Sequence, residues 1–441
     1  MDADVSESAD PPGDSDGPGA GRKDGPAAGR NSEGPGADGG RAGADDGGPV
    51  ADPDAPRGRH WPRWAALGAA LVVLAAAGVG SWLYRKLDAN IKTDTSAAAE
   101  LRVYERERPA TVVRDAENIL LIGSDTRAGD NRAYGRDDGG SQRSDTTILL
   151  HLAADRESVT AISLPRDLMV EIPVCHRPGG AATKKQFAQF NWAYQFGGTA
   201  CTIRTVEKLT GIRIDHQMVV DFNGFKDMVD AVGGVEVCLK KPVDDPDARL
   251  KLPAGRQNLD GEQALGYVRA RKSIGNGSDT ERMDRQQQFL GALVNKVQSD
   301  GVLLNPTRLY PVLDAATKSL TTDPGLDSLA DLYDLVRELR DVPTDGVQFL
   351  TVPRQPYGPD PNRDELIQPD AKRLFDRLRA DAPVTVVPTD QIERDDRKNL
   401  NGDNRKNSGK NNASADTPGA ASPNPTPTYS GNNAAVDPCR R

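Results

Sequence analysis

The chain has 441 residues and a formal net charge of −9, from 65 acidic and 56 basic side chains. This acidic balance gives no support to a nucleic-acid-binding function. Residues 1–60 are rich in Gly, Ala, Asp and Pro, and residues 390–441 in Asn, Asp, Lys, Pro, Ser and Thr. Both segments have too little apolar surface to order themselves, so the sequence predicts disordered tails around one globular domain.

Residues 64–84 are rich in Ala, Leu and Val and contain no charged side chain. This length spans a bilayer, and Trp and Tyr at both ends suit the membrane interfaces. We expect an uncleaved transmembrane anchor, with residues 1–60 cytoplasmic and the chain from residue 86 outside the cell membrane. A buried helix of the globular domain is the alternative. Residues 86–112 predict a helical stalk, and residues 113–385 the extracytoplasmic domain.

The four cysteines, Cys175, Cys201, Cys238 and Cys439, allow three complete disulfide pairings, among which the sequence does not choose. Their spacing matches no zinc site. We expect disulfides, which agree with export, and the alternative is free buried thiols. A bond from Cys439 to Cys238 or Cys175 would tie the end of the predicted tail to the domain.

Strands and helices alternate along the predicted domain. Apolar runs predict strands at 118–122, 146–153, 158–164, 235–239 and 347–352. Helical periodicity and capping residues predict helices at 185–196, 202–209, 221–232, 283–297, 306–318, 326–339 and 369–378, with a short one from Asp260. Residues 267–271 alternate as the end of a strand does. This order predicts a three-layer α/β/α single domain with a central mixed sheet.

Two aspartates lie at predicted strand ends. Asp125 directly follows a buried strand, and Asp145 precedes the next one. Side chains at strand ends converge on the crevice where α/β sheets bind ligands. Two carboxylates there would repel each other unless a cation lay between them, and Mg²⁺ uses one or two protein carboxylates together with phosphate oxygens. Alternatively, Asp125 caps a turn and Asp145 pairs with Arg143.

Arginines gather around the same segments. Arg269 and Arg271 are two residues apart, so on an extended backbone they point to one face and favour an anion across them. Arg282 and Gln286 are neighbours on a helix, whereas Arg285 lies one residue off that face. A surface ion pair is the alternative for any single arginine. The candidate anion-binding residues are Arg127, Arg143, Arg166, Arg269, Arg271, Arg282, Arg285 and Gln286.

Other catalytic arrangements have little support. The chain has four histidines, and they suggest no Ser-His-Asp or Cys-His arrangement. We expect His216 to be a structural hydrogen-bonding residue rather than a base.

Seven segments resemble the LytR–CpsA–Psr family of cell-wall glycopolymer ligases, over residues 117–300 and more loosely to about residue 380. They are Asn118-Ile-Leu-Leu-Ile-Gly-Ser-Asp125, Arg143-Ser-Asp-Thr146, Ile162-Ser-Leu-Pro-Arg-Asp167, Asn191-Trp-Ala-Tyr194, Val220-Asp-Phe-Asn-Gly-Phe225, Val232-Gly-Gly-Val-Glu-Val237 and Leu259-Asp-Gly-Glu-Gln-Ala-Leu-Gly-Tyr-Val-Arg-Ala-Arg271. Each segment is modest alone, but their order and spacing are specific. The loop at 128–140 and the interval from Arg271 to Arg282 are long for that family.

The resemblance implies an α/β/α domain with a hydrophobic tunnel for a polyprenyl chain. It implies Mg²⁺-assisted transfer of a glycopolymer phosphate from a polyprenyl-pyrophosphate carrier to a peptidoglycan hydroxyl, with pyrophosphate hydrolysis as a side activity. Asp125 and Asp145 would hold Mg²⁺. The residues that would bind the pyrophosphate oxygens are Arg143, Arg166, Arg269, Arg271, Arg282 and Gln286, with Arg285 as the rival of Arg282.

Two other functions are compatible with parts of this pattern. A non-catalytic envelope scaffold or regulator that binds polyprenyl pyrophosphate would use the same arginines but would leave the paired aspartates unexplained. A membrane-tethered regulator of transcription would need a basic DNA-reading element in residues 1–60, which are acidic and rich in Gly.

Overall fold

The structure is a computed structural model that describes residues 61–124, 144–177, 180–271, 273–274, 279–299, 305–388, 428–436 and 439. The chain divides into two compact units, residues 1–66 and 67–441. Only the first residues of helix α1 (Trp61–Asp88) represent the first unit in the described part of the chain. The fold below is that of the second unit.

A nine-stranded mixed sheet forms the centre of this unit. Its strand order is β1-β12-β7-β2-β3-β4-β13-β17-β16. The strands are β1 (Lys92–Thr93), β2 (Glu117–Ser124), β3 (Ser144–Leu152), β4 (Val159–Leu164), β7 (His216–Val220), β12 (Leu320–Thr322), β13 (Val347–Thr351), β16 (Thr385–Pro388) and β17 (Thr428–Asn433). Strand β3 is antiparallel to β2 and β4, whereas β7 is parallel to β2 and β13 is parallel to β4.

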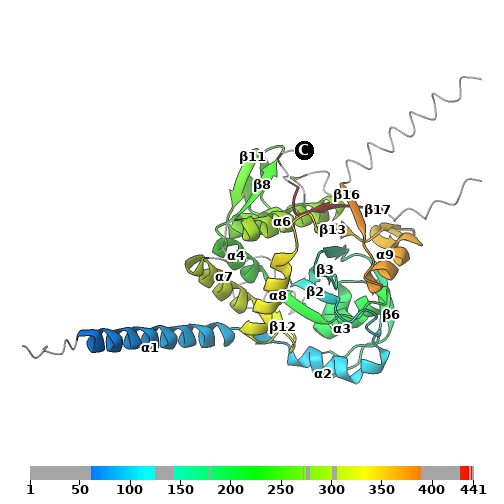
Figure 1. Ribbon diagram of the computed structural model, residues 1–441. Helices are drawn as coiled ribbons and strands as arrows, with labels where there is room; N and C mark the ends of the chain where they lie inside the picture. Colours follow the sequence, from blue (N-terminus) through cyan, green and yellow to red (C-terminus); the bar gives the residue numbers. More distant parts are fainter. Residues whose placement is uncertain are drawn as a thin grey trace, which may run out of the picture. The chain divides into compact units, whose positions relative to one another are not determined.

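Helices cover both faces of the sheet. They are α2 (Thr95–Val103), α3 (Trp192–Thr210), α4 (Phe222–Ala231), α5 (Gly261–Arg269), α6 (Asp279–Ser299), α7 (Pro306–Ser319), α8 (Leu329–Asp341), α9 (Asp370–Arg379) and the 3₁₀ helix η1 (Glu105–Glu107). Alternate side chains of β2 point to opposite faces of the sheet. Leu120 packs in the core with α3 and α9, and Ile119 packs in the core with α8. The three-layer α/β/α fold with a mixed central sheet is therefore confirmed (Figure 1).

A second core lies beside the main sheet. It joins α4, α5 and α6 to two small antiparallel sheets, and Val229, Leu259 and Phe289 are fully buried there. The small sheets are β8 (Val235–Leu239) with β11 (Gly255–Leu259), and β9 (Val243–Asp245) with β10 (Leu250–Leu252). Two further hairpins are β5 (Met169–Ile172) with β6 (Gln186–Gln189), and β14 (Arg354–Tyr357) with β15 (Asp360–Leu366).

Helix α1 is long and apolar enough to cross a membrane, judged by length and composition. Its last turn joins the domain directly. Asp88 Oδ1 accepts a hydrogen bond from the Leu329 backbone N–H at 2.9 Å, and Lys86 Nζ donates to the Tyr310 hydroxyl at 3.2 Å. Residues 86–112 contain helices α2 and η1, in agreement with the predicted helical content, but the segment packs against the domain and is not a separate stalk. Strand β1 pairs with β12, and Arg108 forms an ion pair with Glu207 of α3 at 2.7 Å. These contacts attach the segment to the domain.

Two local predictions are wrong for identifiable reasons. Residues 186–189 form strand β6 rather than helix, and α3 begins only at Trp192. The alternating apolar positions of this short run fit both periodicities, and pairing with β5 decides between them. Residues 267–269 are the last turn of α5 rather than a strand. The Asp260–Gln263 capping box starts that helix, and the Ala270 N–H still donates to the Gly266 carbonyl.

The C-terminal region also departs from the prediction of an unstructured segment over 390–441. Residues 428–433 form β17, which pairs with β13 on one side and with β16 on the other. Cys238 is bonded to Cys439, one of the two pairings considered for that cysteine. Backbone hydrogen bonds and the buried side chains of Tyr429 and Ala434 stabilise this strand. The apolar content of the segment alone is too low to predict it.

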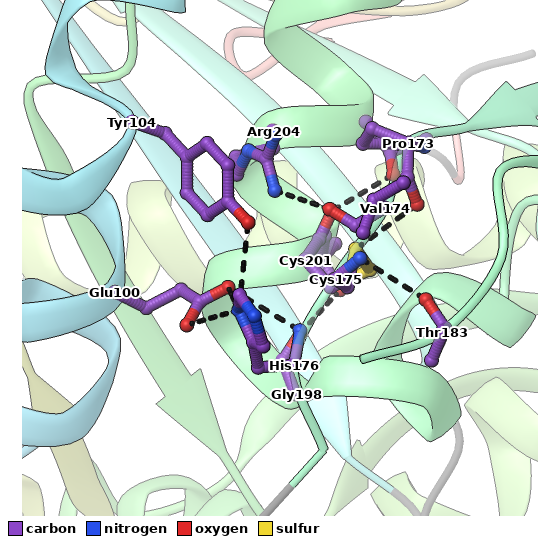
Figure 2. The surroundings of a disulfide bond; sticks show 12 residues. Glu100, Tyr104, Pro173, Val174, Cys175, His176, Thr183, Gly198, Cys201 and Arg204 are labelled. Atoms are coloured by element: carbon purple, nitrogen blue, oxygen red, sulfur yellow. Dashed lines mark hydrogen bonds and ion pairs between the residues drawn. A yellow bond between two sulfur atoms is a disulfide. The ribbon is translucent and has the colours of Figure 1, made fainter. Parts of the chain in front are cut away.

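The second disulfide joins Cys175 to Cys201 and is buried (Figure 2). A Cβ on Gly197 would lie 2.9 Å from the Cβ of Cys201 and 3.0 Å from that of Cys175, so only glycine fits there. The same region holds α2 in place. His176 pairs with Glu100 at 2.9 Å, and the Arg204 guanidinium lies 3.3 Å from the centre of the Tyr104 ring (Figure 2).

Candidate functional site

One edge of the main sheet collects the candidate residues. In the sheet register Ser124 at the end of β2 pairs with Ser144 at the start of β3, and Thr147 pairs with Leu164 at the end of β4. The parallel neighbours β7 and β13 end at the same edge. The topology therefore brings Asp145, the segment after β4 and the start of α4 to one side of the domain.

Asp145 and Arg166 form the centre of a charged chain. Arg166 Nη1 donates to Asp145 Oδ1 at 3.1 Å, and Arg166 Nε donates to Asp167 Oδ2 at 3.1 Å. Gln189 Nε2 donates to Asp167 Oδ1 at 2.6 Å. Burial alone would lower the pKa of Arg166, but the charges of Asp167 and Asp145 outweigh it and raise that pKa. Asp145 remains partly exposed, so a ligand can reach its carboxylate.

Arg282 is the buried member of the site. It lies in the first turns of α6, its side chain is 6% exposed, and its Nη2 pairs with Asp279 Oδ1 at 2.7 Å. Burial lowers the pKa of Arg282 to about 10. The carboxylate of Asp279 opposes this effect, and the nearby positive charges of Arg271 and Arg166 add to it. The charges of Arg166 and Arg271 therefore act on the buried Arg282, and such a gathering of positive charge makes this edge a candidate anion site.

The other predicted residues divide between this cluster and its support. Arg271, just beyond α5, belongs to the cluster through its charge interaction with Arg282. Arg269 ends α5 and lies over the Phe222 ring, with its Cζ 4.6 Å from the ring centre, so the shared extended face expected of these two arginines is wrong. Arg285 donates to the Ala270 carbonyl, and Gln286 Nε2 donates to the Val268 carbonyl at 3.2 Å. The Arg285 and Gln286 side chains therefore fix the backbone around Arg269 and Arg271.

Asp125, Arg127 and Arg143 lie outside the described residues. Their expected roles remain predictions. The register places their two flanking strand ends, Ser124 and Ser144, opposite each other at the site edge.

Several unpartnered buried polar atoms lie at this edge. Among the described residues, Ser144 Oγ, Asn191 Oδ1, Asp279 Oδ2, Arg282 Nε and Arg285 Nε have no hydrogen-bond partner and almost no exposed surface. The Asn191 backbone N–H donates to the Arg166 carbonyl at 3.0 Å, which places Asn191 beside the charged chain. Buried polar groups are normally satisfied, so these five atoms are candidate partners for a polar ligand.

The described residues contain no group of three or more His, Cys, Asp or Glu side chains that could hold a metal ion on its own. This is compatible with Mg²⁺ bound to a phosphate ligand, because that ion uses one or two carboxylates and takes its remaining oxygens from phosphate and water. The accessible carboxylate of Asp145 fits such a role, and the ion would neutralise charge on the phosphate oxygens.

Sequence reasoning did not assign roles to several supporting residues. Gln287 is 2% exposed and donates to Ser163 Oγ at 3.0 Å and to Thr351 Oγ1 at 2.9 Å, which fixes α6 to the ends of β4 and β13. Asp279 was also missed, although its position three residues before Arg282 on one helix was an available signal.

A cavity of about 250 Å³ lies elsewhere, between α2, α3 and the start of β7. It includes His216, which pairs with Asp323 Oδ1 at 3.2 Å. Burial alone would lower the pKa of His216, but the Asp323 carboxylate outweighs it and raises that pKa. His216 is the first residue of β7, whereas Arg166, Arg271 and Arg282, which we name the arginine cluster, lie at the edge where β7 ends. The cavity is therefore at the opposite edge of the sheet.

The chain thus folds into an α/β domain with several arginines at one edge of its central sheet. The model of the LytR_cpsA_psr family matches residues 87–379, and the chain belongs to this family. A protein of Streptococcus agalactiae, gbs0355, has the same fold: its crystal structure matches with a TM-score of 0.50 and 23% identity, over 60% of this chain and 87% of that chain.

Three curated relatives are similar in sequence. "Probable cell wall biosynthesis protein LcpB" of Corynebacterium glutamicum is 40% identical over 49% of this chain and 51% of its own length. "Cell wall biosynthesis protein LcpA" of that organism is 34% identical over 54% of this chain and 50% of its own length. The polyisoprenyl-teichoic acid–peptidoglycan teichoic acid transferase TagT of Bacillus subtilis is 27% identical over 68% of this chain and 88% of its own length. The chain spans about half the length of the two Corynebacterium relatives.

Proposed function

We propose that this protein is a membrane-anchored transferase that moves a phosphate-linked glycopolymer from a polyprenyl diphosphate to a hydroxyl group of peptidoglycan. The relatives named as cell wall biosynthesis proteins and as a teichoic acid–peptidoglycan transferase support the polymer and the acceptor. The apolar helix α1 supports the anchor. That the domain lies on the outer side of the membrane is part of the proposal. A tunnel for the polyprenyl chain is part of the proposal.

The observation that carries the proposal is the convergence of Arg166, Arg271 and Arg282 beside the accessible carboxylate of Asp145. A diphosphate offers several charged oxygens to planar guanidinium groups, which bind such oxygens in pairs. Arg282 Nε, which has no partner within the described part of the chain, is a donor for one of these oxygens. Asp145, together with Asp125, is the proposed carboxylate pair for Mg²⁺.

In phosphoryl transfer the protein mainly positions the reacting groups and stabilises the charge that develops on the phosphate oxygens. The acceptor hydroxyl oxygen attacks the phosphorus that carries the glycopolymer, the bond from that phosphorus to the bridging oxygen breaks, and polyprenyl phosphate leaves. The hydroxyl proton is released as the new phosphodiester forms. Arg166, Arg271 and Arg282 stabilise the negative charge that develops on the leaving phosphate. If water replaces the acceptor, the same site hydrolyses the diphosphate as a side activity.

The test is transfer by the full-length protein in detergent, with a polyprenyl-diphosphate-linked disaccharide as donor and peptidoglycan fragments as acceptor. We expect Mg²⁺-dependent product and release of polyprenyl phosphate. Arg166→Ala should lower the rate about 10²-fold, as loss of a preorganised charge contact does. A wild-type protein that binds the donor but never transfers would instead indicate the non-catalytic scaffold.

A further inference from the structure

Two aromatic side chains, one exposed and one half-buried, lie next to the charged chain. Phe187 of β6 is 57% exposed, and its ring centre lies 6.0 Å from that of Tyr357 in β14, with the rings tilted by 55°. These residues come from hairpins about 170 residues apart in sequence. We name this pair, with its polar neighbours Gln189, Asp360 and Arg363, the aromatic shelf.

The shelf is continuous with the arginine cluster. Phe187 and Gln189 lie on the same face of β6, roughly 7 Å apart along the strand. Gln189 donates to Asp167, and Asp167 in turn accepts from Arg166. From the other hairpin, Arg363 Nη1 lies 3.5 Å from Asp167 Oδ1. Asp167 therefore connects both hairpins that carry the aromatic rings to the guanidinium of Arg166, which contacts Asp145.

The exposed Phe187 ring is not part of the main core. Phe187 leaves more than half of its surface to water, and the opposite face of β6 buries Ala188 in the main core. Exposed aromatic rings rimmed by polar groups are typical of binding surfaces. The patch is two rings wide, which is small for a stable protein interface of about 800 Å² per partner.

We propose that the aromatic shelf binds the sugar rings of the acceptor, an N-acetylated amino-sugar glycan, and places its hydroxyl group against the arginine cluster. A pyranose ring has an apolar C–H face that stacks on an aromatic ring, and an edge of hydroxyl and amide groups that suits Gln189, Asp360 and Arg363. These three side chains supply amide, carboxylate and guanidinium partners for that edge. The inference rests on the proposed function, since it assigns the acceptor of that same site.

The probe is tetra-N-acetylchitotetraose, a β-1,4-linked amino-sugar tetrasaccharide, titrated calorimetrically into the full-length protein in detergent. We expect Phe187→Ala and Tyr357→Ala each to weaken its binding about tenfold, as truncation of an aromatic anchor does. Phe187→Trp should bind like the wild type, whereas Phe187→Leu should be as weak as Phe187→Ala, because leucine is apolar but has no ring face. Tyr333→Ala is the matched control, since Tyr333 is 53% exposed on α8 in the other helical layer.

The same samples are titrated with geranyl diphosphate and Mg²⁺, which reports on the arginine cluster and on the integrity of the fold. We expect this binding to be unchanged in the shelf variants. Equal tetrasaccharide affinity in the wild type, Phe187→Ala and Tyr357→Ala overturns the inference, and so does a wild type that binds no tetrasaccharide, as it would if the shelf docked a protein or a lipid. If the wild type binds the tetrasaccharide at the shelf but binds no diphosphate, the proposed function fails and the glycan surface stands.

Discussion

Arg282→Met separates a ligand-binding charge from a structural one. The Arg282 side chain is 6% exposed, and its pKa falls to about 10, chiefly because burial removes water. A tenfold change in acidity corresponds to about 1.4 kcal/mol, so holding this charge costs the folded, ligand-free protein about 3 kcal/mol. Methionine has a similar shape and no charge, and therefore removes that cost. The partner Asp279 is 25% exposed and regains water when it loses the ion pair.

We therefore expect the melting temperature of ligand-free Arg282→Met to equal that of the wild type or to exceed it by up to about 6 °C. The affinity for geranyl diphosphate with Mg²⁺ should fall about 30-fold or more, because a charge-assisted hydrogen bond in a buried site is lost. The assays are thermal denaturation and calorimetric titration of the same two proteins.

Arg108→Met is the matched control. Arg108 is also buried, with a side chain 10% exposed, but it donates to both carboxylate oxygens of Glu207. Burial alone would lower the pKa of Arg108, and the hydrogen bonds to Glu207 outweigh burial and raise it. This variant should melt at a lower temperature than the wild type and bind the diphosphate normally. If Arg282→Met melts several degrees lower and keeps its diphosphate affinity, Arg282 is structural and the reasoning is refuted.

Three further predictions concern the metal, pH and the C-terminal strand. Asp145→Asn should abolish the stimulation of donor binding by Mg²⁺, measured by titration with and without the ion; undiminished stimulation would contradict the role of Asp145. The raised pKa of His216 means that its pair with Asp323 stabilises the fold fully below pH 6.5 and loses this effect as pH rises through the folded pKa. Urea denaturation should therefore show a larger loss in His216→Gln at pH 5.5 than at pH 8.5, and an equal loss at both would refute the pairing. Cys439→Ser should lower the free energy of unfolding by about 2–5 kcal/mol, because it opens the bond from Cys238 that closes a 201-residue separation; an unchanged midpoint would argue against that bond.

Helix caps and the bounds of one strand are features of the fold that the sequence specifies locally. Val235–Leu239 forms β8 with the predicted bounds, and the Asp221 and Asp260 side chains cap α4 and α5. These signals are local, since they depend on residue type and on spacing within one element. Strand β17 could not be predicted in this way, because its stability comes from two neighbours that are distant in sequence.

In the site, too, the sequence specifies local features but not contacts between distant segments. The sequence identified Arg282 and Gln286 as neighbours on one helix, but only the fold separates their contacts: Arg282 pairs with Asp279, and Gln286 donates to the Val268 carbonyl. The orientation of Arg269 failed because the capping box extends α5 to that residue. Gln287 looks like any polar helix residue until α6 is placed against the ends of β4 and β13.

The central claim is that Arg166, Arg271 and Arg282 surround one diphosphate next to Asp145. A crystal structure with a polyprenyl diphosphate and Mg²⁺ measures this directly. The diphosphate oxygens are expected within hydrogen-bond distance of all three guanidiniums, with the metal on Asp145. Density for the diphosphate at another surface, with these arginines contacting only their protein partners, would contradict the account.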